Sequence, residues 1–534
     1  MIKAVRGTRD LLPPETALWN FVEAAVRDVF RAYNFQEIRT PIFEETALFA
    51  RGVGEETDIV SKEMYTWEDG GGSADYDLLV AWLAKNSAEI TPIQLPVPVT
   101  NQRTRLGPGA QVMWKGVWTL VRARYAATHA DLLQLQYTGQ AWQAMSSGAE
   151  IRLVMVTLKG TVSDTYALIA KRMGIEVDEL DLPKFDSPQM LTLRPESTAG
   201  VVRAYIQHGL EKNGLNKLYY IGPQFRRERP QKGRYRQFYQ IGAEVIGPAS
   251  AGSESPARDA EVLEMLATLL DRLGIADWNL ELNSVGTPAD RAAFNEALRK
   301  ALEPVKETMC ADCQRRAVTN PLRVFDCKVP EDQPIIETLP RITQFLGEDS
   351  RKHFAAVQEI LIKVGVRFSL NDRLVRGLDY YTRTAFEFTH GALGAQNAIL
   401  GGGRYDGLSE ALGGPAAPGI GFAIGEDRLV MSLKETAEGV LRKPDVYVAP
   451  MTAMNGEAAK LAHELRRHDV VVELGDENFR LKKSFEAATK AGARYILIVG
   501  ENEVKADAFS LKNLATGEQV SVPRGELARW IQGK

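Results

Sequence analysis

The sequence has few of the features that mark a secreted or membrane protein. Its 534 residues include three cysteines, too few for a disulfide framework, which favours a reducing compartment. No apolar run reaches the roughly 18 residues that cross a membrane, and no signal-peptide pattern opens the chain. Excess charge is also lacking: 65 Lys and Arg face 69 Asp and Glu, for a net charge of −4. We therefore expect a cytoplasmic protein without a membrane partner, whose contacts with nucleic acid are local.

The length exceeds what one hydrophobic core supports, so several domains are expected. Apolar periodicity predicts an amphipathic helix over residues 15–33, and alternating strands and helices near the C-terminus predict a small α/β domain. A mostly helical block precedes that domain, and a stretch rich in glycine and proline interrupts the first half. The predicted units are residues 1–69, an atypical insertion 70–188, residues 189–287, a helical subdomain 288–367, residues 368–436 and a C-terminal domain 443–534.

The most basic stretch of the chain is residues 217–244, in which two strand-like runs flank a loop. Between Lys217 and Arg236, seven Lys and Arg stand against a single acid, Glu228. Arg226 and Glu228 are two residues apart, so they face the same side of a strand. Because arginine grips phosphate bidentately, the pattern predicts a hairpin that holds an anionic ligand. The alternative is a solvated surface hairpin, which explains the alternation less well.

Three further stretches place charged side chains beside glycines: residues 193–200, 374–383 and 419–429. Arg376 has apolar neighbours, and such an arginine needs an anionic partner, either a ligand or Asp379 in a core salt bridge. Glycines in the last stretch leave room for a ligand against the backbone. Ser197 or Thr198 is expected to cap a helix, which leaves Glu196 at a strand end facing a cleft.

Glycine also dominates residues 401–407, Gly-Gly-Gly-Arg-Tyr-Asp-Gly, for which we expect a turn.

The insertion has its own character. Residues 101–124 carry five basic residues and no acid, interleaved with Trp114 and Trp118. Such a pattern binds single-stranded nucleic acid or, as we favour here, forms a linker packed by its tryptophans. A strand over residues 150–159 and a helix over residues 163–173 are expected. The flanking residues 67–70 and 188–193 resemble two strands of a hairpin, and an insertion at a hairpin tip costs little stability.

The three cysteines invite a zinc interpretation. Cys310 and Cys313 are separated by two residues, and Cys327 follows. A structural zinc site has four ligands, but no histidine or fourth cysteine lies nearby in sequence. His353 or His390 would have to come from a distance. Free thiols and no bound metal are therefore expected.

Taken together, these motifs resemble the histidyl-tRNA synthetases, a family of class II aminoacyl-tRNA synthetases. Arg39-Thr-Pro41 resembles the first class II motif, which lies at a dimer interface. Residues 225–238 resemble the second motif, and residues 421–428 resemble the third. The segments Leu374–Tyr381 and Gly401–Gly407 match two signatures of histidine specificity. The resemblance covers residues 1–69 and 189–534.

The resemblance implies an α+β fold, with an antiparallel catalytic sheet flanked by helices and a C-terminal α/β anticodon-binding domain. It implies a homodimer that joins L-histidine to tRNA(His) through histidyl-adenylate, with ATP as substrate and AMP and diphosphate as products. Mg2+ is expected with ATP, without a dedicated protein site. The alternative is a non-catalytic synthetase-like regulatory subunit of histidine biosynthesis. The retained arginines and the C-terminal domain argue against that alternative.

The resemblance also implies roles for individual residues. Arg376 and Arg226 are the catalytic candidates, with Arg229 and Lys232 toward the tRNA. ATP contacts are expected from Arg226, Glu228, Arg234, Phe238 and Arg428, and histidine contacts from Glu196, Thr198, Gln240, Glu244, Tyr380 and Tyr381. The family usually has glycine where this chain has Ser197, which would strain the backbone if φ were positive there. In the C-terminal domain, the basic cluster Arg480, Lys482, Lys483 and Lys490 suits either tRNA or a solvated helix face.

Overall fold

The computed structural model describes residues 2–54, 57, 59–69, 189–231, 233–375, 380–393, 397–433 and 437–533, with six short strands between residues 104 and 157. Those six strands are β4 (Thr104–Leu106), β5 (Gln111–Trp114), β6 (Val117–Leu120), β7 (Leu133–Tyr137), β8 (Trp142–Ala144) and β9 (Val156–Thr157). Of the strand expected over residues 150–159, the structure describes Val156–Thr157, which form β9, and the other residues lie outside the described part of the chain. The helix expected over residues 163–173 lies outside the described residues, as do the side chains of Trp114 and Trp118.

The centre of the molecule is an eight-stranded sheet whose order is β1-β11-β12-β17-β16-β15-β13-β14. The six inner strands pair antiparallel, and β1 and β14 join the two edges in parallel. Its strands are β1 (Gln36–Glu37), β11 (Asn216–Phe225), β12 (Gln237–Ile246), β17 (Gly419–Gly425), β16 (Ala398–Arg404), β15 (Thr382–His390), β13 (Trp278–Ser284) and β14 (Ser369–Leu370). The basic stretch 217–244 is thus the β11–β12 hairpin, as expected.

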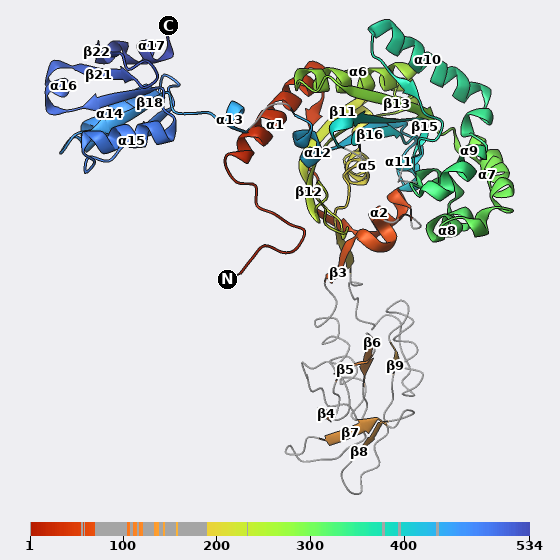
Figure 1. Ribbon diagram of the computed structural model, residues 1–534. Helices are drawn as coiled ribbons and strands as arrows, with labels where there is room; N and C mark the ends of the chain where they lie inside the picture. The colour runs from red at the N-terminus through yellow and green to blue at the C-terminus, as the bar shows by residue number, and fades with distance from the viewer. Residues whose placement is uncertain are drawn as a thin grey trace.

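The alternation of side chains along β12 separates the two faces of this sheet. Ile241, Ala243 and Val245 enter the main hydrophobic core. That core is completed by α1 (Glu15–Ala32), α6 (Pro256–Arg272) and α10 (Glu348–Val364). On the other face lie α5 (Thr198–Gln207) and α11 (Leu408–Ala411), which pack with Ile246 and Tyr405 (Figure 1). Gln240, Gly242 and Glu244 also point to this second face, so the core-forming pattern leaves it for polar groups.

A second, three-stranded sheet has the order β2-β10-β3 and receives the insertion. Its strands are β2 (Phe43–Glu45), β10 (Gln189–Leu193) and β3 (Tyr65–Asp69). β3 and β10 pair antiparallel, with Asp69 opposite Gln189, so the insertion enters at the tip of a hairpin, as expected. Upstream, Pro41 lies in the gap between β1 and β2, as expected for a residue that a central strand excludes.

The glycine run 401–403 forms β16, and the expectation of a turn there is wrong. A Cβ on Gly402 would lie 2.1 Å from the carbonyl oxygen of Gly421, and one on Gly403 would lie 2.8 Å from the ring of Tyr381. The glycines therefore permit close packing inside a strand, where the sequence pattern alone suggested a change of direction.

The helical block has its own small core. It contains α7 (Pro288–Leu302), α8 (Ala311–Thr319) and α9 (Gln333–Thr338), whose buried side chains form a separate cluster ending at Leu346. α9 ends at Thr338 because Pro340 follows, and the residue before a proline avoids the helical region. By contrast, α10 packs on the main core through Phe354 and Leu361.

The C-terminal residues form an α/β domain with a five-stranded sheet of order β19-β18-β20-β21-β22 (Figure 1). The predicted alternation is present as β18 (Val446–Pro450), α14 (Asn455–Arg466), β19 (Val472–Leu474), α15 (Leu481–Ala491) and β20 (Tyr495–Val499). Four elements that were not predicted follow: α16 (Glu501–Ala506), β21 (Ala508–Asn513), β22 (Gln519–Pro523) and α17 (Leu527–Gln532). Among the described residues, no helix has both the length and the apolar character that crossing a membrane requires.

Candidate active site

Two cavities lie on the polar face of the central sheet. One has a volume of about 200 Å³ and is lined by arginine and carboxylate side chains, and the other has a volume of about 220 Å³ and is lined by carboxylate, hydroxyl and phenol groups. Arg226, Gln240 and Gly401 line both cavities. The site therefore consists of two adjoining pockets of different chemistry, with a guanidinium at their junction.

Glu196 holds the start of α5, beside the second cavity. Its carboxylate accepts hydrogen bonds from the backbone N–H groups of Thr198 and Ala199, at 2.7 and 3.0 Å. Glu196 therefore satisfies the helix terminus, and the expectation that Ser197 or Thr198 caps it is wrong. Burial raises the pKa of Glu196, although these N–H groups and Arg226 act to lower it.

Ser197 is accommodated without backbone strain. Its φ is −113°, in the region that every L-residue adopts. Its hydroxyl accepts a hydrogen bond from the Gln224 side chain at 2.6 Å. The departure from the family's usual glycine is therefore compatible with the site.

Glu244 lies behind the second cavity and does not line it. One carboxylate oxygen accepts the Thr198 hydroxyl at 2.7 Å, and the other has no partner among the described residues. Burial raises the pKa of Glu244 to about 8, and the nearby Glu196 contributes to the rise. Across the sheet, a Cβ on Gly421 would lie 1.7 Å from the second oxygen, so glycine is required opposite this carboxylate.

Three tyrosines form the wall of the second cavity. The rings of Tyr380 and Tyr381 are 4.8 Å apart, and Arg291 donates a hydrogen bond to the Tyr381 carbonyl oxygen. Tyr220 completes the wall from β11, where it lies opposite Gly242. Burial raises the pKa of Tyr220 and of Tyr380 well above the usual value, so both phenols are neutral. Tyr220 was missed from the sequence, although its position opposite a glycine in the basic hairpin could have revealed it.

The first cavity is lined by three arginines, Arg226, Arg234 and Arg428, and by three carboxylates, Glu228, Glu387 and Asp427. Arg226 donates a hydrogen bond to the Pro195 carbonyl oxygen at 2.8 Å, and its guanidinium lies 5.3 Å from the centre of the Phe238 ring. Glu228 lies between Arg226 and Arg234, at 3.8 and 3.2 Å. Burial, followed by the charge of Arg234, lowers the pKa of Arg428. The arginines thus face a shared space that suits a polyanion.

Other expected site residues lie away from these contacts. Arg229 is exposed in the loop between β11 and β12. Arg376 lies outside the described residues, as do its alternative partner Asp379 and the tRNA candidate Lys232. One contact was not anticipated: Arg9 pairs with Asp427, a lining residue of the cationic cavity, at 2.8 Å.

The antiparallel catalytic sheet with flanking helices, together with the C-terminal α/β domain, defines a class II aminoacyl-tRNA synthetase. The family model "Histidyl-tRNA synthetase" matches residues 170–429, and the model "Anticodon binding domain" matches residues 445–534. The histidine–tRNA ligase of Koribacter versatilis (strain Ellin345) is 56% identical over 534 residues, covering 100% of this chain and 96% of that protein. That of Solibacter usitatus (strain Ellin6076) is 45% identical, covering 99% and 98%. The chain belongs to the histidyl-tRNA synthetase family.

Solved structures agree with this assignment. The crystal structure of apo S. aureus histidyl-tRNA synthetase has a TM-score of 0.65 and 30% identity, with full coverage of both chains. A structure described as an ATP phosphoribosyltransferase regulatory subunit/histidyl-tRNA synthetase from Bacillus halodurans C has a TM-score of 0.53 over 93% of this chain and 98% of that one. At 16% identity, the second likeness shows the fold alone.

Proposed function

We propose that the chain ligates L-histidine to tRNA(His) at the expense of ATP. The observation that carries this proposal is the pair of adjoining cavities that share Arg226. One cavity suits an amino acid with polar ends, and the other suits a polyphosphate. Their junction is where the two substrates would react.

The first step joins two anions. The histidine carboxylate attacks the α-phosphorus of ATP, a new O–P bond forms and diphosphate leaves, giving histidyl-adenylate. Because nucleophile and electrophile are both negative, the site must supply positive charge and alignment. Arg226 meets this need at the junction, and Arg376 is proposed to stabilise the charge that develops on the α-phosphate. In the second step, a hydroxyl of the terminal adenosine of tRNA attacks the histidyl carbonyl carbon, and AMP leaves.

Histidine would occupy the second cavity. Its ammonium is proposed to contact Glu196, Thr198 and Gln240, and its imidazole to contact Tyr381, with Tyr380 beside it. Glu244 is proposed to contact the imidazole from behind the cavity wall, where it accepts the hydroxyl of Thr198, a lining residue, at 2.7 Å. Unpaired buried polar groups cost about 1–3 kcal/mol each, so wrong amino acids would be rejected.

ATP would occupy the first cavity. Phe238 is proposed to stack on adenine, with Glu228 beside the adenine amino group. Arg234 and Arg428 would hold the distal phosphates. Mg2+ would bind to these phosphates and to one carboxylate of the cavity wall. Glu387 lines this cavity and could supply that carboxylate.

The larger partners are also part of the proposal. Arg229 and Lys232 would meet the acceptor end of tRNA, and the C-terminal domain would bind the anticodon, with the exposed basic cluster of α15 as a candidate contact. Ile42, Phe43 and Trp67 are large apolar side chains exposed on or beside the second sheet, and the rings of Phe43 and Trp67 are in contact on one face of it. Since these side chains flank the first class II motif, a second copy of the chain would cover them. The dimer would work in the cytoplasm, where cysteine side chains stay reduced.

The regulatory-subunit alternative is disfavoured. A subunit that does not bind ATP has no use for three arginines around one cavity, and this chain keeps Arg226, Arg234 and Arg428 there. Two relatives, 56% and 45% identical to this chain, are named histidine–tRNA ligases, and each match spans nearly the whole length of the relative.

Histidine-dependent exchange of pyrophosphate into ATP tests the proposal directly. The intact protein should exchange with histidine and with none of the other amino acids. Arg226→Lys should lower the exchange rate by roughly 10²–10³-fold, because a point charge replaces a bidentate donor. Arg227→Lys is the matched control. The Arg227 guanidinium lies over the Tyr65 ring, 4.9 Å from its centre, so near-normal exchange is expected. Equal losses in both variants, or exchange with another amino acid, would contradict the assignment.

A further inference from the structure

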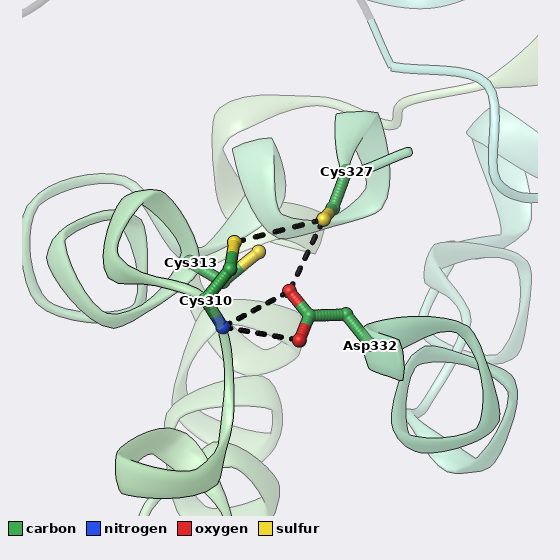
Figure 2. Close-up of side chains that lie close together, drawn as sticks. All are labelled: Cys310, Cys313, Cys327 and Asp332. Carbon is green, nitrogen blue, oxygen red and sulfur yellow. Dashed lines mark hydrogen bonds between the residues drawn. The ribbon is translucent and has the colours of Figure 1, made fainter. Parts of the chain in front are cut away.

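Four potential metal ligands converge in the helical subdomain. Cys310, Cys313, Cys327 and Asp332 each offer one ligand atom, and these atoms all lie within 4.8 Å of one another (Figure 2). The Sγ atoms of Cys310 and Cys327 are 3.9 Å apart, and Cys327 Sγ lies 3.1 Å from an Asp332 oxygen. The fourth group, Asp332, follows Cys327 by five residues.

We propose that these four residues bind one Zn2+ ion as a structural site. A tetrahedral zinc with Zn–S bonds of about 2.3 Å places sulfur atoms about 3.8 Å apart, close to the separation of Cys310 and Cys327. Three soft thiolates favour zinc over magnesium or calcium. Four protein ligands close the coordination sphere, so the site is structural and leaves no position for a substrate. The expectation of free thiols depended on the lack of a fourth ligand, which Asp332 supplies.

Backbone hydrogen bonds already orient the ligands. The Val329 N–H donates to Cys327 Sγ at 3.4 Å, and the Cys310 N–H donates to the two oxygens of Asp332 at 3.0 and 3.3 Å. Such outer contacts direct ligand atoms toward a metal and stabilise the charge on them. One Asp332 oxygen can bind zinc while the other keeps the Cys310 N–H.

The position of the cluster explains what a metal would do for the fold. Cys310 and Asp332 directly precede α8 and α9, and Cys313 and Cys327 belong to the buried cluster of the subdomain. The α-helices that contribute to that cluster have 15, 9 and 6 residues, and the rest of the cluster comes from short turns and loops between them. Cores this small usually need a metal or a disulfide as reinforcement. Zinc would fix the starts of two short helices at one point.

The site also connects to the segment that leads to Arg376. The Gln333 amide donates to the carbonyl oxygens of Cys327 and Val329, at 2.9 and 3.1 Å. From the same helix, Gln333 and Glu337 accept hydrogen bonds from Arg373, at 2.7 and 2.5 Å. Loss of zinc would therefore loosen the approach to Arg376, a consequence that rests on the proposed function. Metal binding itself does not depend on that function.

Elemental analysis of the intact, tag-free protein tests the proposal. The expected result is one zinc per chain, retained through purification without added metal. Cys327→Ser and Asp332→Asn should each weaken zinc retention by about tenfold or more. Asp312→Asn is the matched control and should keep full zinc, because Asp312 lies between Cys310 and Cys313 but its side chain is 64% exposed and pairs with Arg315.

A second measurement uses the wild-type protein, so it does not depend on whether the variants fold. Wild-type protein produced with Co2+ should show a thiolate-to-cobalt charge-transfer band and the intense visible bands of four-coordinate cobalt. The proposal is overturned if zinc is substoichiometric and cobalt gives no such bands. It is also overturned if mass spectrometry finds a Cys310–Cys327 disulfide in place of metal, or if Asp332→Asn leaves zinc content and cobalt spectrum unchanged.

Discussion

Two buried carboxylates, Glu196 and Glu244, lie on either side of Thr198, and their surroundings give them different chemistry. Glu196 accepts two backbone N–H groups, whereas Glu244 accepts one hydroxyl and keeps an oxygen without a partner among the described residues. Burial raises the pKa of both, and that of Glu244 to about 8. With its pKa raised to about 8, Glu244 changes its protonation near neutral pH.

Glu244→Gln should change how stability depends on pH. The folded wild type holds a proton on Glu244 that the unfolded chain releases near its ordinary pKa of 4.5. The free energy of unfolding should therefore fall as pH rises from roughly 4.5 to 8, and this contribution should level off above that range. Glutamine does not titrate, so the variant should gain stability relative to wild type across the same window. Urea unfolding of both proteins at several pH values measures the difference.

The same variant should raise the KM for histidine more than the KM for ATP, because Glu244 adjoins only the second cavity. Glu410→Gln, an exposed carboxylate on α11, is the control and should follow wild type in both measurements. A stability difference that stays constant with pH, together with an unchanged KM for histidine, would remove Glu244 from its proposed role.

At the scale of elements, the sequence predicted the hairpin, the amphipathic first helix and the C-terminal alternation, because each has a regular apolar period. It failed where packing overrode local pattern. The glycines of β16 resemble a turn, yet their function is to admit the Tyr381 ring and the neighbouring strand. Tyr220 and Asp332 were missed for a similar reason, since the role of each depends on contacts with residues that are distant in sequence.

The three-stranded sheet carries the element-scale prediction. Phe43 is 48% exposed and its ring contacts Trp67, with 6.0 Å between ring centres, so glutamate there would place a charge inside the proposed dimer interface. Phe43→Glu should weaken dimerisation by roughly 30-fold or more, the effect of losing a central apolar contact. Light scattering at a series of concentrations gives the dissociation constant. Ile362→Glu, at an apolar side chain 68% exposed on α10, should leave the dimer intact. A monomeric wild type, or equal effects of both changes, would refute this interface.

At the scale of the whole molecule, the family resemblance located the cavities, because their residues belong to four separated motifs that keep their order along the chain. The boundaries of the units remain a proposal. Packing does show that α10 joins the main core while α7, α8 and α9 form a cluster of their own. Sequence periodicity could not distinguish these cases, because all four helices carry an apolar stripe and the stripe does not specify its partner.

Deleting residues 72–186 tests how independent the catalytic core is from the insertion. Asp69 and Gln189 are paired in adjacent strands, so the remaining Gly-Gly-Ser-Pro would close a four-residue hairpin loop. The chain-entropy cost of closing the loop would fall by at most about 3 kcal/mol, which favours the shortened hairpin. Exchange activity should stay within a few-fold of wild type, because the described residues that line the two cavities all lie outside the deleted segment. Pyrophosphate exchange, light scattering and tRNA charging of the shortened protein distinguish the possible outcomes.

Full exchange with loss of tRNA charging would mean that the insertion contributes to tRNA binding. An unfolded product would mean that the catalytic core depends on the insertion.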